Sequence, residues 1–214
     1  MTIVNVFDKI ESNKIKKVGF TLDGQITVIT GGMFSGKSEY LIEKCKKIET
    51  YGKKKVKVYK PSNDDRFSDH EVVSHIGYRF KATNLPIKLK KKDIEGVLEE
   101  TKDIDVVGFD EAQFFNRNIM TLVDLLAREG KQVFVAGLNM DYRGREFGFV
   151  GGLLAMADDI VRLYSYCAVC GSEKGTHTQR LINGKPDDKG SETIMIGDTE
   201  VYEPRCRSCF IPPQ

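Results

Sequence analysis

A glycine-rich stretch near the N-terminus constrains the fold of this chain more than any other part. Residues 31–38 read GGMFSGKS and lie between an alternating apolar run, residues 26–29, and a helix-like segment, residues 39–45. This is the G-x-x-x-x-G-K-[ST] pattern in the strand–loop–helix context that it requires. Glycines let successive backbone N–H groups point inward, and the N-terminus of the following helix adds partial positive charge. The stretch therefore predicts a polyphosphate-binding loop rather than a glycine turn that only joins two elements.

Each residue of this loop has an expected task. Lys37 is expected to reach the β and γ phosphates of a nucleotide, and the Ser38 hydroxyl to bind Mg²⁺. The backbone that would surround the phosphates belongs to Gly31, Gly32, Met33, Phe34, Ser35 and Gly36.

Length and charge exclude several classes of protein. With 214 residues the chain can form one sizeable core and a small satellite. Its 33 Lys and Arg against 31 Asp and Glu give a net charge of +2, which does not indicate a nucleic-acid or membrane partner. No apolar run approaches ~18 residues, and no signal peptide is recognisable at the N-terminus. We therefore expect a soluble, cytoplasmic protein.

Alternating strand and helix patterns predict an α/β fold, in which a mostly parallel sheet is flanked by helices. The first helix is expected to end near Tyr51-Gly52, with Gly52 as its C-cap. Two short β-like pieces, residues 71–76 and 78–82, suggest a hairpin on the edge of the main sheet. The remaining predicted strands are residues 56–59, 104–109, 131–138 and 159–164, and the remaining helices are residues 93–102, 119–129 and 151–157. We expect residues 25–165 to form the phosphate-binding domain, after an N-terminal extension of residues 1–24.

Two acidic residues, Asp110 and Glu111, follow the apolar strand predicted at residues 104–109. Open α/β sheets bind ligands at the carboxyl ends of their strands. Asp110 is suited to hold Mg²⁺, directly or through water, and Glu111 to take a proton from a substrate hydroxyl. The alternative is that both carboxylates only cap the next helix.

Two aromatic residues, Tyr142 and Phe147, lie in the loop that follows the strand predicted at residues 131–138. They suit either ordinary loop packing or the walls of a site for a flat ring.

Four cysteines form two C-x-x-C pairs, Cys167 with Cys170 and Cys206 with Cys209. Four thiolates suit tetrahedral Zn²⁺ and leave no open position for catalysis, so a structural zinc site is predicted, against redox chemistry or disulfides as alternatives. Residues 171–205 would then form a long loop closed at its base by the metal and able to fold over the sheet edge. We expect residues 166–214 to be a small zinc-binding lasso domain, and the fifth cysteine, Cys45, to be a packed helix residue.

With these features the chain closely resembles the type II thymidine kinases over residues 26–210. The resemblance is carried by GGMFSGKS at 31–38, DDRFS at 64–68, FDEAQFF at 109–115, RGREFG at 143–148, TQR at 178–180 and the two cysteine pairs. It implies transfer of the γ-phosphate of ATP to the 5′-hydroxyl of thymidine or deoxyuridine, with Mg²⁺. It also implies a structural zinc that tethers a lasso loop over the nucleoside, and a homotetramer. Inhibition by thymidine triphosphate is left open.

The resemblance also implies roles for individual residues. Lys37 and Ser38 match the phosphate and magnesium residues, Asp110 matches the acid that assists magnesium, and Glu111 matches the catalytic base. Arg66 matches an arginine near the reacting oxygens, with Asp64 beside it. The positions that match the nucleoside pocket are Met33, Phe114, Leu138, Tyr142, Phe147, Thr178 and Tyr202, together with lasso backbone at Met195, Ile196 and Gly197.

The chain departs from the family pattern at several positions. Gly32 stands where proline is common, and Tyr142 stands where phenylalanine is usual, so that its hydroxyl needs a partner. Asp198 follows Gly197 where a small residue is more common, and the N-terminal extension is longer than the usual lead-in.

Two other functions are compatible with a phosphate-binding loop. One is an ATPase whose cysteine module binds a nucleic-acid strand. The near-neutral net charge and the lack of a basic, aromatic-rich stretch in this module argue against it. The other is a regulator that binds ATP without turnover, against which Glu111 and Arg66 count.

Overall fold

The computed structural model describes residues 24–62, 71–74, 76–187 and 201–213. The elements of the larger unit are β1 (Gln25–Gly31), α1 (Lys37–Gly52), β2 (Val56–Pro61), β3 (Glu71–Val73), β4 (Arg79–Leu85), α2 (Lys91–Glu100), β5 (Val106–Phe109), the 3₁₀ turn η2 (Ala112–Phe114), α3 (Asn118–Arg128), β6 (Gln132–Leu138), α4 (Val150–Met156) and β7 (Asp159–Arg162). The C-terminal elements are β8 (His177–Ile182), β9 (Lys185–Pro186) and β10 (Tyr202–Arg205).

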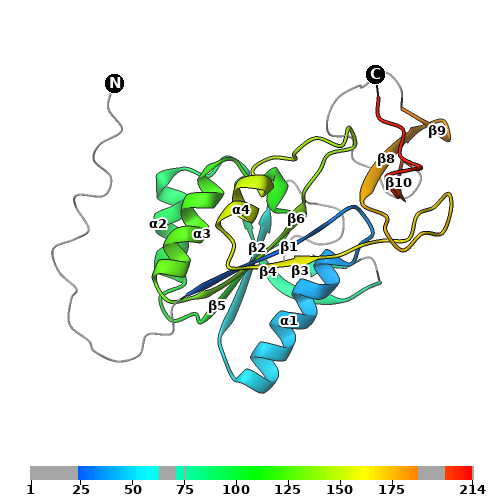
Figure 1. The fold of residues 1–214 in the computed structure, drawn as a ribbon. Helices are drawn as coiled ribbons and strands as arrows, with labels where there is room; N and C mark the ends of the chain where they lie inside the picture. The colour runs from blue at the N-terminus through cyan, green and yellow to red at the C-terminus, as the bar shows by residue number, and fades with distance from the viewer. Residues whose placement is uncertain (1–23, 63–70, 75, 188–200, 214) are drawn as a thin grey trace, which may run out of the picture.

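A seven-stranded sheet, in the order β3-β4-β2-β5-β6-β1-β7, forms the centre of the molecule (Figure 1). All of its pairings are parallel except that of β3 with β4. The predicted α/β architecture is confirmed. The edge hairpin is confirmed in part, since β3 and β4 pair antiparallel, but β4 also pairs parallel with β2 and so belongs to the main sheet.

Helices cover both faces of this sheet. On one face α1 packs its buried side chains Leu41, Ile42 and Cys45 against alternate strand residues, and on the other face α2, α3 and α4 pack against the remaining ones. Strand β5 shows the alternation, because Val106 lies in the α1 cluster and Val107 in the opposite cluster. A strand buried on both faces has to be apolar throughout, which is why these strands read as continuous hydrophobic runs.

The prediction that Gly52 caps α1 is wrong. The helix includes Gly52, and the left-handed residue is Lys53, with φ 51°. The Lys53 backbone N–H donates to the carbonyl of Ile48, which offsets the cost of about 1 kcal/mol that a left-handed residue with a side chain carries.

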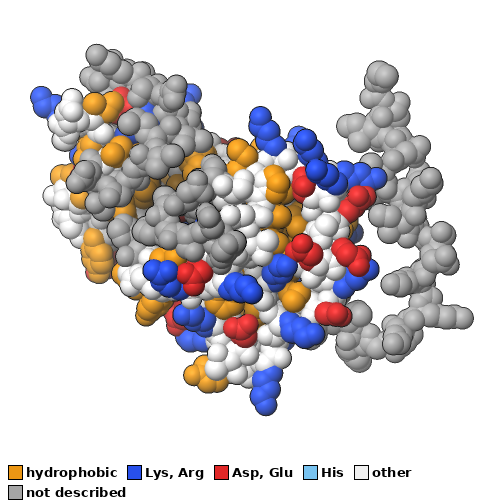
Figure 2. All heavy atoms as spheres, turned by 180° about the vertical axis from the view of Figure 1, so that it is seen from behind, with side chains coloured by type: hydrophobic (Ala, Val, Ile, Leu, Met, Phe, Trp, Pro, Cys, Tyr) orange, Lys and Arg blue, Asp and Glu red, His pale blue; other side chains and the backbone are white. Residues whose placement is uncertain are grey.

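The C-terminal strands form a separate three-stranded antiparallel sheet in the order β10-β8-β9. Figure 1 shows this module at the end of the molecule where the loop between β1 and α1 lies. On the face drawn in Figure 2, Lys and Arg side chains are interspersed with Asp and Glu rather than gathered by sign. Within the described residues, no helix has both the length and the apolar character needed to cross a bilayer.

Candidate active site

The loop between β1 and α1 has the shape that phosphate binding needs. Phe34 (φ 60°) and Gly36 (φ 82°) both take left-handed conformations, and such turns direct neighbouring N–H groups into a concavity. Two side chains stabilise the loop from within, because Ser35 Oγ and Lys37 Nζ donate to the Gly32 carbonyl over 2.9 and 2.7 Å. The Lys37 amine therefore folds back over the loop interior, where a phosphate group would meet it.

Ser38 and Asp110 meet directly across the sheet edge. Ser38 Oγ, at the start of α1, donates to Asp110 Oδ2 over 2.9 Å, and Asp110 is buried. Strand pairing explains the meeting, since the Asp110 backbone N–H donates to the Tyr59 carbonyl and so continues the β5–β2 ladder to the edge. A hydroxyl and a carboxylate side by side beside a phosphate loop are ligands that suit Mg²⁺. The residues present therefore fit this ion.

Glu111 is held in place by a neighbouring glutamine. Glu111 itself takes a left-handed conformation, with φ 49°, at the turn from β5 into η2. Gln113 Nε2 donates to Glu111 Oε2, while Gln113 Oε1 accepts the backbone N–H of Leu138 over 3.0 Å. Because the amide oxygen is taken by a donor from β6, the amide nitrogen has to face the carboxylate. The buried Gln113 side chain thus sets where the Glu111 carboxylate points.

Several residues predicted for the nucleoside pocket meet in pairs. The rings of Phe114 and Phe147 lie edge to face, with centroids 5.7 Å apart. The Met33 backbone N–H donates to Thr178 Oγ1 over 3.1 Å, which links the phosphate loop to the C-terminal module. The Tyr142 hydroxyl has the partner that the sequence required, because it accepts from Arg143 Nε over 3.0 Å. Asp64, Arg66, Met195, Ile196 and Gly197, also predicted for the site, lie outside the described residues.

The two cysteine pairs converge on one point. The sulfur atoms of Cys167, Cys170, Cys206 and Cys209 all lie within 4.8 Å of one another, and those of Cys170 and Cys206 are 3.7 Å apart. A tetrahedral zinc site with Zn–S bonds of about 2.3 Å places sulfur atoms about 3.8 Å apart, so the cluster fits zinc. The predicted meeting of the four cysteines is confirmed.

Local backbone geometry favours a thiolate in this cluster. Burial alone would raise the pKa of Cys167, but N–H groups of Cys206, Cys170 and Val169 donate to its sulfur and lower the pKa to about 6. Hydrogen bonding with Cys206 and Cys170 raises the pKa of Cys209 to about 12, which favours the protonated form of this thiol. A cation bound among the sulfurs would replace that proton.

Comparison with known proteins agrees with this geometry. A family model described as thymidine kinase matches residues 24–210. The chain belongs to the thymidine kinase family. It is therefore a kinase, and the phosphorylation of thymidine is the activity that its family carries.

Two solved structures show weak likeness to this chain. It is similar to the genome packaging NTPase B204 from Sulfolobus turreted icosahedral virus 2 in complex with sulfate, with 15% identity, a TM-score of 0.46, and coverage of 67% of this chain and 75% of that one. It is also similar to domain III of the replication initiation protein DnaA from Thermotoga maritima, with 13% identity, a TM-score of 0.37, and coverage of 64% and 54%. At these values neither likeness adds to the family assignment.

For two buried residues, Gln113 and Arg180, the sequence by itself predicts no role. Gln113 lies inside the FDEAQFF motif and Arg180 inside the TQR motif, so the motifs themselves were the signal that could have drawn attention to them. Gln113 orients Glu111, as described above, and Arg180 contacts the ring of Tyr142. Their roles depend on contacts between segments far apart in the chain, which spacing within one motif does not reveal.

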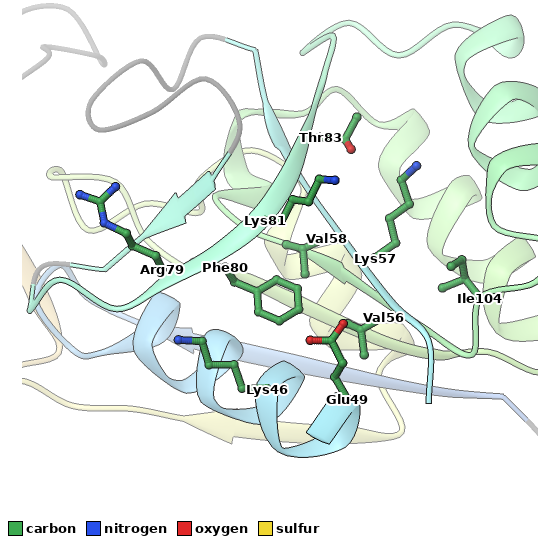
Figure 3. Close-up of a pocket in the computed structure, with 10 residues that line it drawn as sticks. All are labelled: Lys46, Glu49, Val56, Lys57, Val58, Arg79, Phe80, Lys81, Thr83 and Ile104. Carbon is green, nitrogen blue, oxygen red and sulfur yellow. The ribbon is translucent and has the colours of Figure 1, made fainter. Parts of the chain in front are cut away.

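A concave region away from these residues lies between α1 and strands β2 and β4 (Figure 3). It encloses about 460 Å³, and within the described part of the chain none of the predicted site residues lines it. Two of its cations are already paired, Lys57 with Glu100 over 2.7 Å and Arg79 with Glu71 over 2.9 Å. This groove is distinct from the site at the carboxyl edge of the sheet.

Proposed function

We propose that this protein transfers the γ-phosphate of ATP to the 5′-hydroxyl of thymidine or deoxyuridine, giving the nucleoside monophosphate and ADP. The observation that carries the proposal is the contact between Ser38 and Asp110. It joins the phosphate loop to the end of β5, where Glu111 is the next residue. Donor and acceptor groups therefore converge on one edge of the sheet, as a two-substrate site requires.

On the donor side, the chain supplies positioning and charge. Backbone N–H groups of the loop and the N-terminus of α1 would hold the phosphates, and Lys37 would release the Gly32 carbonyl to bind the β and γ oxygens. Ser38 and Asp110 would hold Mg²⁺, which supplies positive charge to the phosphate oxygens when it is bound. Phosphoryl transfer needs little covalent chemistry from a protein, so these tasks account for most of the donor side.

On the acceptor side, Glu111 acts as general base. Its carboxylate, oriented by Gln113, would accept the proton of the 5′-hydroxyl as the bond to phosphorus forms. The edge-to-face pair of Phe114 and Phe147 offers an apolar wall for the nucleoside. Arg66, which lies outside the described residues, stays a predicted stabiliser of the transferring phosphate, with Asp64 beside it.

The four-cysteine cluster has a structural role in this proposal. All four sulfurs would be ligands of one Zn²⁺, which leaves no position for a substrate. The cluster ties the ends of the module together, and Thr178 in β8 meets the phosphate loop at Met33. The lasso backbone at Met195, Ile196 and Gly197 stays predicted as the part that holds the base.

One assay tests the proposal directly. The full chain with zinc is incubated with Mg-ATP and each natural nucleoside in turn, and ADP and nucleoside monophosphate are measured. We expect thymidine and deoxyuridine to be phosphorylated and the other nucleosides to react far more slowly. ADP release that DNA or RNA stimulates and nucleosides do not would overturn the proposal in favour of a nucleic-acid-dependent ATPase.

The expected assembly is a homotetramer, proposed from the family resemblance alone. Light scattering at assay concentration measures its mass, and a monomer with full activity would contradict it.

A further inference from the structure

Arg180, in β8, is a buried cation that the proposed chemistry does not use. Its side chain is fully shielded from solvent. Two of its nitrogens, Nε and Nη2, donate to the same oxygen, Asp187 Oδ2, over 2.9 and 2.7 Å. Burying a charge is costly unless the charge is paired, and the buried carboxylate of Asp187 provides the pairing.

The guanidinium plane also contacts an aromatic ring of the sheet domain. Its central carbon lies 3.6 Å from the ring centroid of Tyr142, which belongs to the loop after β6. The Tyr142 hydroxyl is held separately by Arg143 Nε, so both the face and the edge of this ring are fixed. A flat guanidinium stacks on a ring in a way that a lysine ammonium does not.

A second tyrosine meets the same guanidinium. Tyr202, in β10, is the register partner of Arg180 in the β8–β10 ladder, and the two side chains are hydrogen-bonded. Arg180 thus joins three segments that are far apart in the chain: the loop carrying Tyr142, the end of β9 at Asp187, and the start of β10. Tyr142 and Tyr202 are both positions predicted for the nucleoside pocket.

We propose that Arg180 is a positioning residue for the nucleoside, which acts by holding the rings of Tyr142 and Tyr202 in the orientation that the substrate needs. This inference rests on the proposed function. A residue that only orients the side chains lining the pocket should strengthen binding of the nucleoside equally in the ground state and in the transition state. Its loss should therefore raise the KM for thymidine and leave kcat unchanged. The KM for ATP should not move, because the donor groups lie on the phosphate loop.

The test compares Arg180→Met and Arg180→Lys with the unmodified chain, all as full-length protein with zinc. We expect the KM for thymidine to rise by about 10- to 100-fold in Arg180→Met, which corresponds to about 1.4–2.8 kcal/mol of binding free energy. Arg180→Lys keeps the positive charge but loses the flat guanidinium and its two nitrogen donors to Asp187. The KM for thymidine should therefore rise in this variant too, but by less than in Arg180→Met. Zinc content should remain that of the unmodified chain in both variants.

Lys131 provides a matched control. It is also a buried cation, and its Nζ donates to the carbonyls of Thr101 and Ile104, at the opposite end of the sheet from the phosphate loop. Lys131→Met should lower the stability of the fold without raising the KM for thymidine. An equal rise of KM in Lys131→Met would mean that general destabilisation explains the effect, and would overturn the positioning role.

The outcomes separate this inference from the proposed function. If the unmodified chain neither phosphorylates thymidine nor is stabilised by it against heat, the proposed function fails and the inference fails with it. If the unmodified chain is active and the KM for thymidine is unchanged in either folded Arg180 variant, the positioning role alone is overturned. Arg180→Lys serves as the decisive variant if Arg180→Met does not fold.

Discussion

Replacement of Gln113 by methionine tests how Glu111, the proposed catalytic base, is oriented. The Gln113 amide bridges the Glu111 carboxylate and the backbone N–H of Leu138, and methionine has nearly the same length but neither hydrogen bond. A hydrogen bond to a charged group contributes about 1.5–3 kcal/mol. If that free energy serves to hold Glu111 in its reactive orientation, its loss lowers kcat by about 10- to 150-fold, because about 1.36 kcal/mol corresponds to a factor of ten.

The same substitution should also destabilise the fold. It leaves the N–H of Leu138, which is part-buried, without its acceptor, at a cost of up to about 1–3 kcal/mol. Steady-state kinetics give kcat and both KM values, and urea unfolding gives the free energy of unfolding. We expect both KM values to stay unchanged, because Gln113 lies behind the base rather than against a substrate in our proposal.

Gln113→Glu separates the two effects. Its carboxylate still accepts from Leu138, so the free energy of unfolding should fall less than in Gln113→Met. A glutamate at this position can donate to Glu111 only if the two carboxylates share a proton. If they share one, Glu111 is less able to accept a proton from the substrate; if they do not, charge repulsion moves the two carboxylates apart. Both variants should therefore have low kcat values. A normal kcat in Gln113→Met, or a kcat that follows only the loss of stability, would refute the reasoning.

Four further outcomes are expected. Glu111→Gln should lower kcat by roughly 10²–10⁴-fold with ATP and thymidine binding retained, as calorimetry and kinetics would show, and retained turnover would refute its role as base. Gly148→Ala should cost at least about 2 kcal/mol in urea unfolding, because Gly148 has φ 59° and an added Cβ would lie 2.2 Å from the carbonyl oxygen of Gln113; near-normal stability would contradict the close approach. Thr178→Val removes the acceptor of the Met33 N–H and should raise both KM values by about five-fold, the equivalent of about 1 kcal/mol, so unchanged KM values would mean that this link is unimportant. Zinc chelation should abolish thymidine binding before ATP binding in titrations of each ligand, whereas equal loss of both would show that zinc supports the whole fold.

The phosphate loop, which forms the proposed donor half of the site, was predictable because its signals are local. A phosphate loop needs glycines, a lysine and a hydroxyl at fixed spacing, and the predicted residues form the expected turn between β1 and α1. The meeting of Ser38 with Asp110 followed from the same logic, since parallel strands end at a common edge. The four cysteines likewise fit a metal whose geometry fixes their spacing. In each case the residue types and their spacing within a short segment are enough to predict the local geometry.

The proposed acceptor half depends on contacts that local patterns do not contain. Glu111 accepts a hydrogen bond from an amide whose other end is held by β6, and the ring of Tyr142 contacts an arginine from the C-terminal module. Sequence placed Gln113 and Arg180 within motifs but gave neither a role.

The glycine-rich loop, the strand and helix order and the cysteine pairs were thus determined by the sequence alone, because each rests on backbone geometry or ligand chemistry within a short segment. Only the tertiary structure decided which buried polar groups meet. Burial obliges the Gln113 amide and the Arg180 guanidinium to find partners, and which partners they find depends on how the β6 edge, the Tyr142 loop and the C-terminal module pack together.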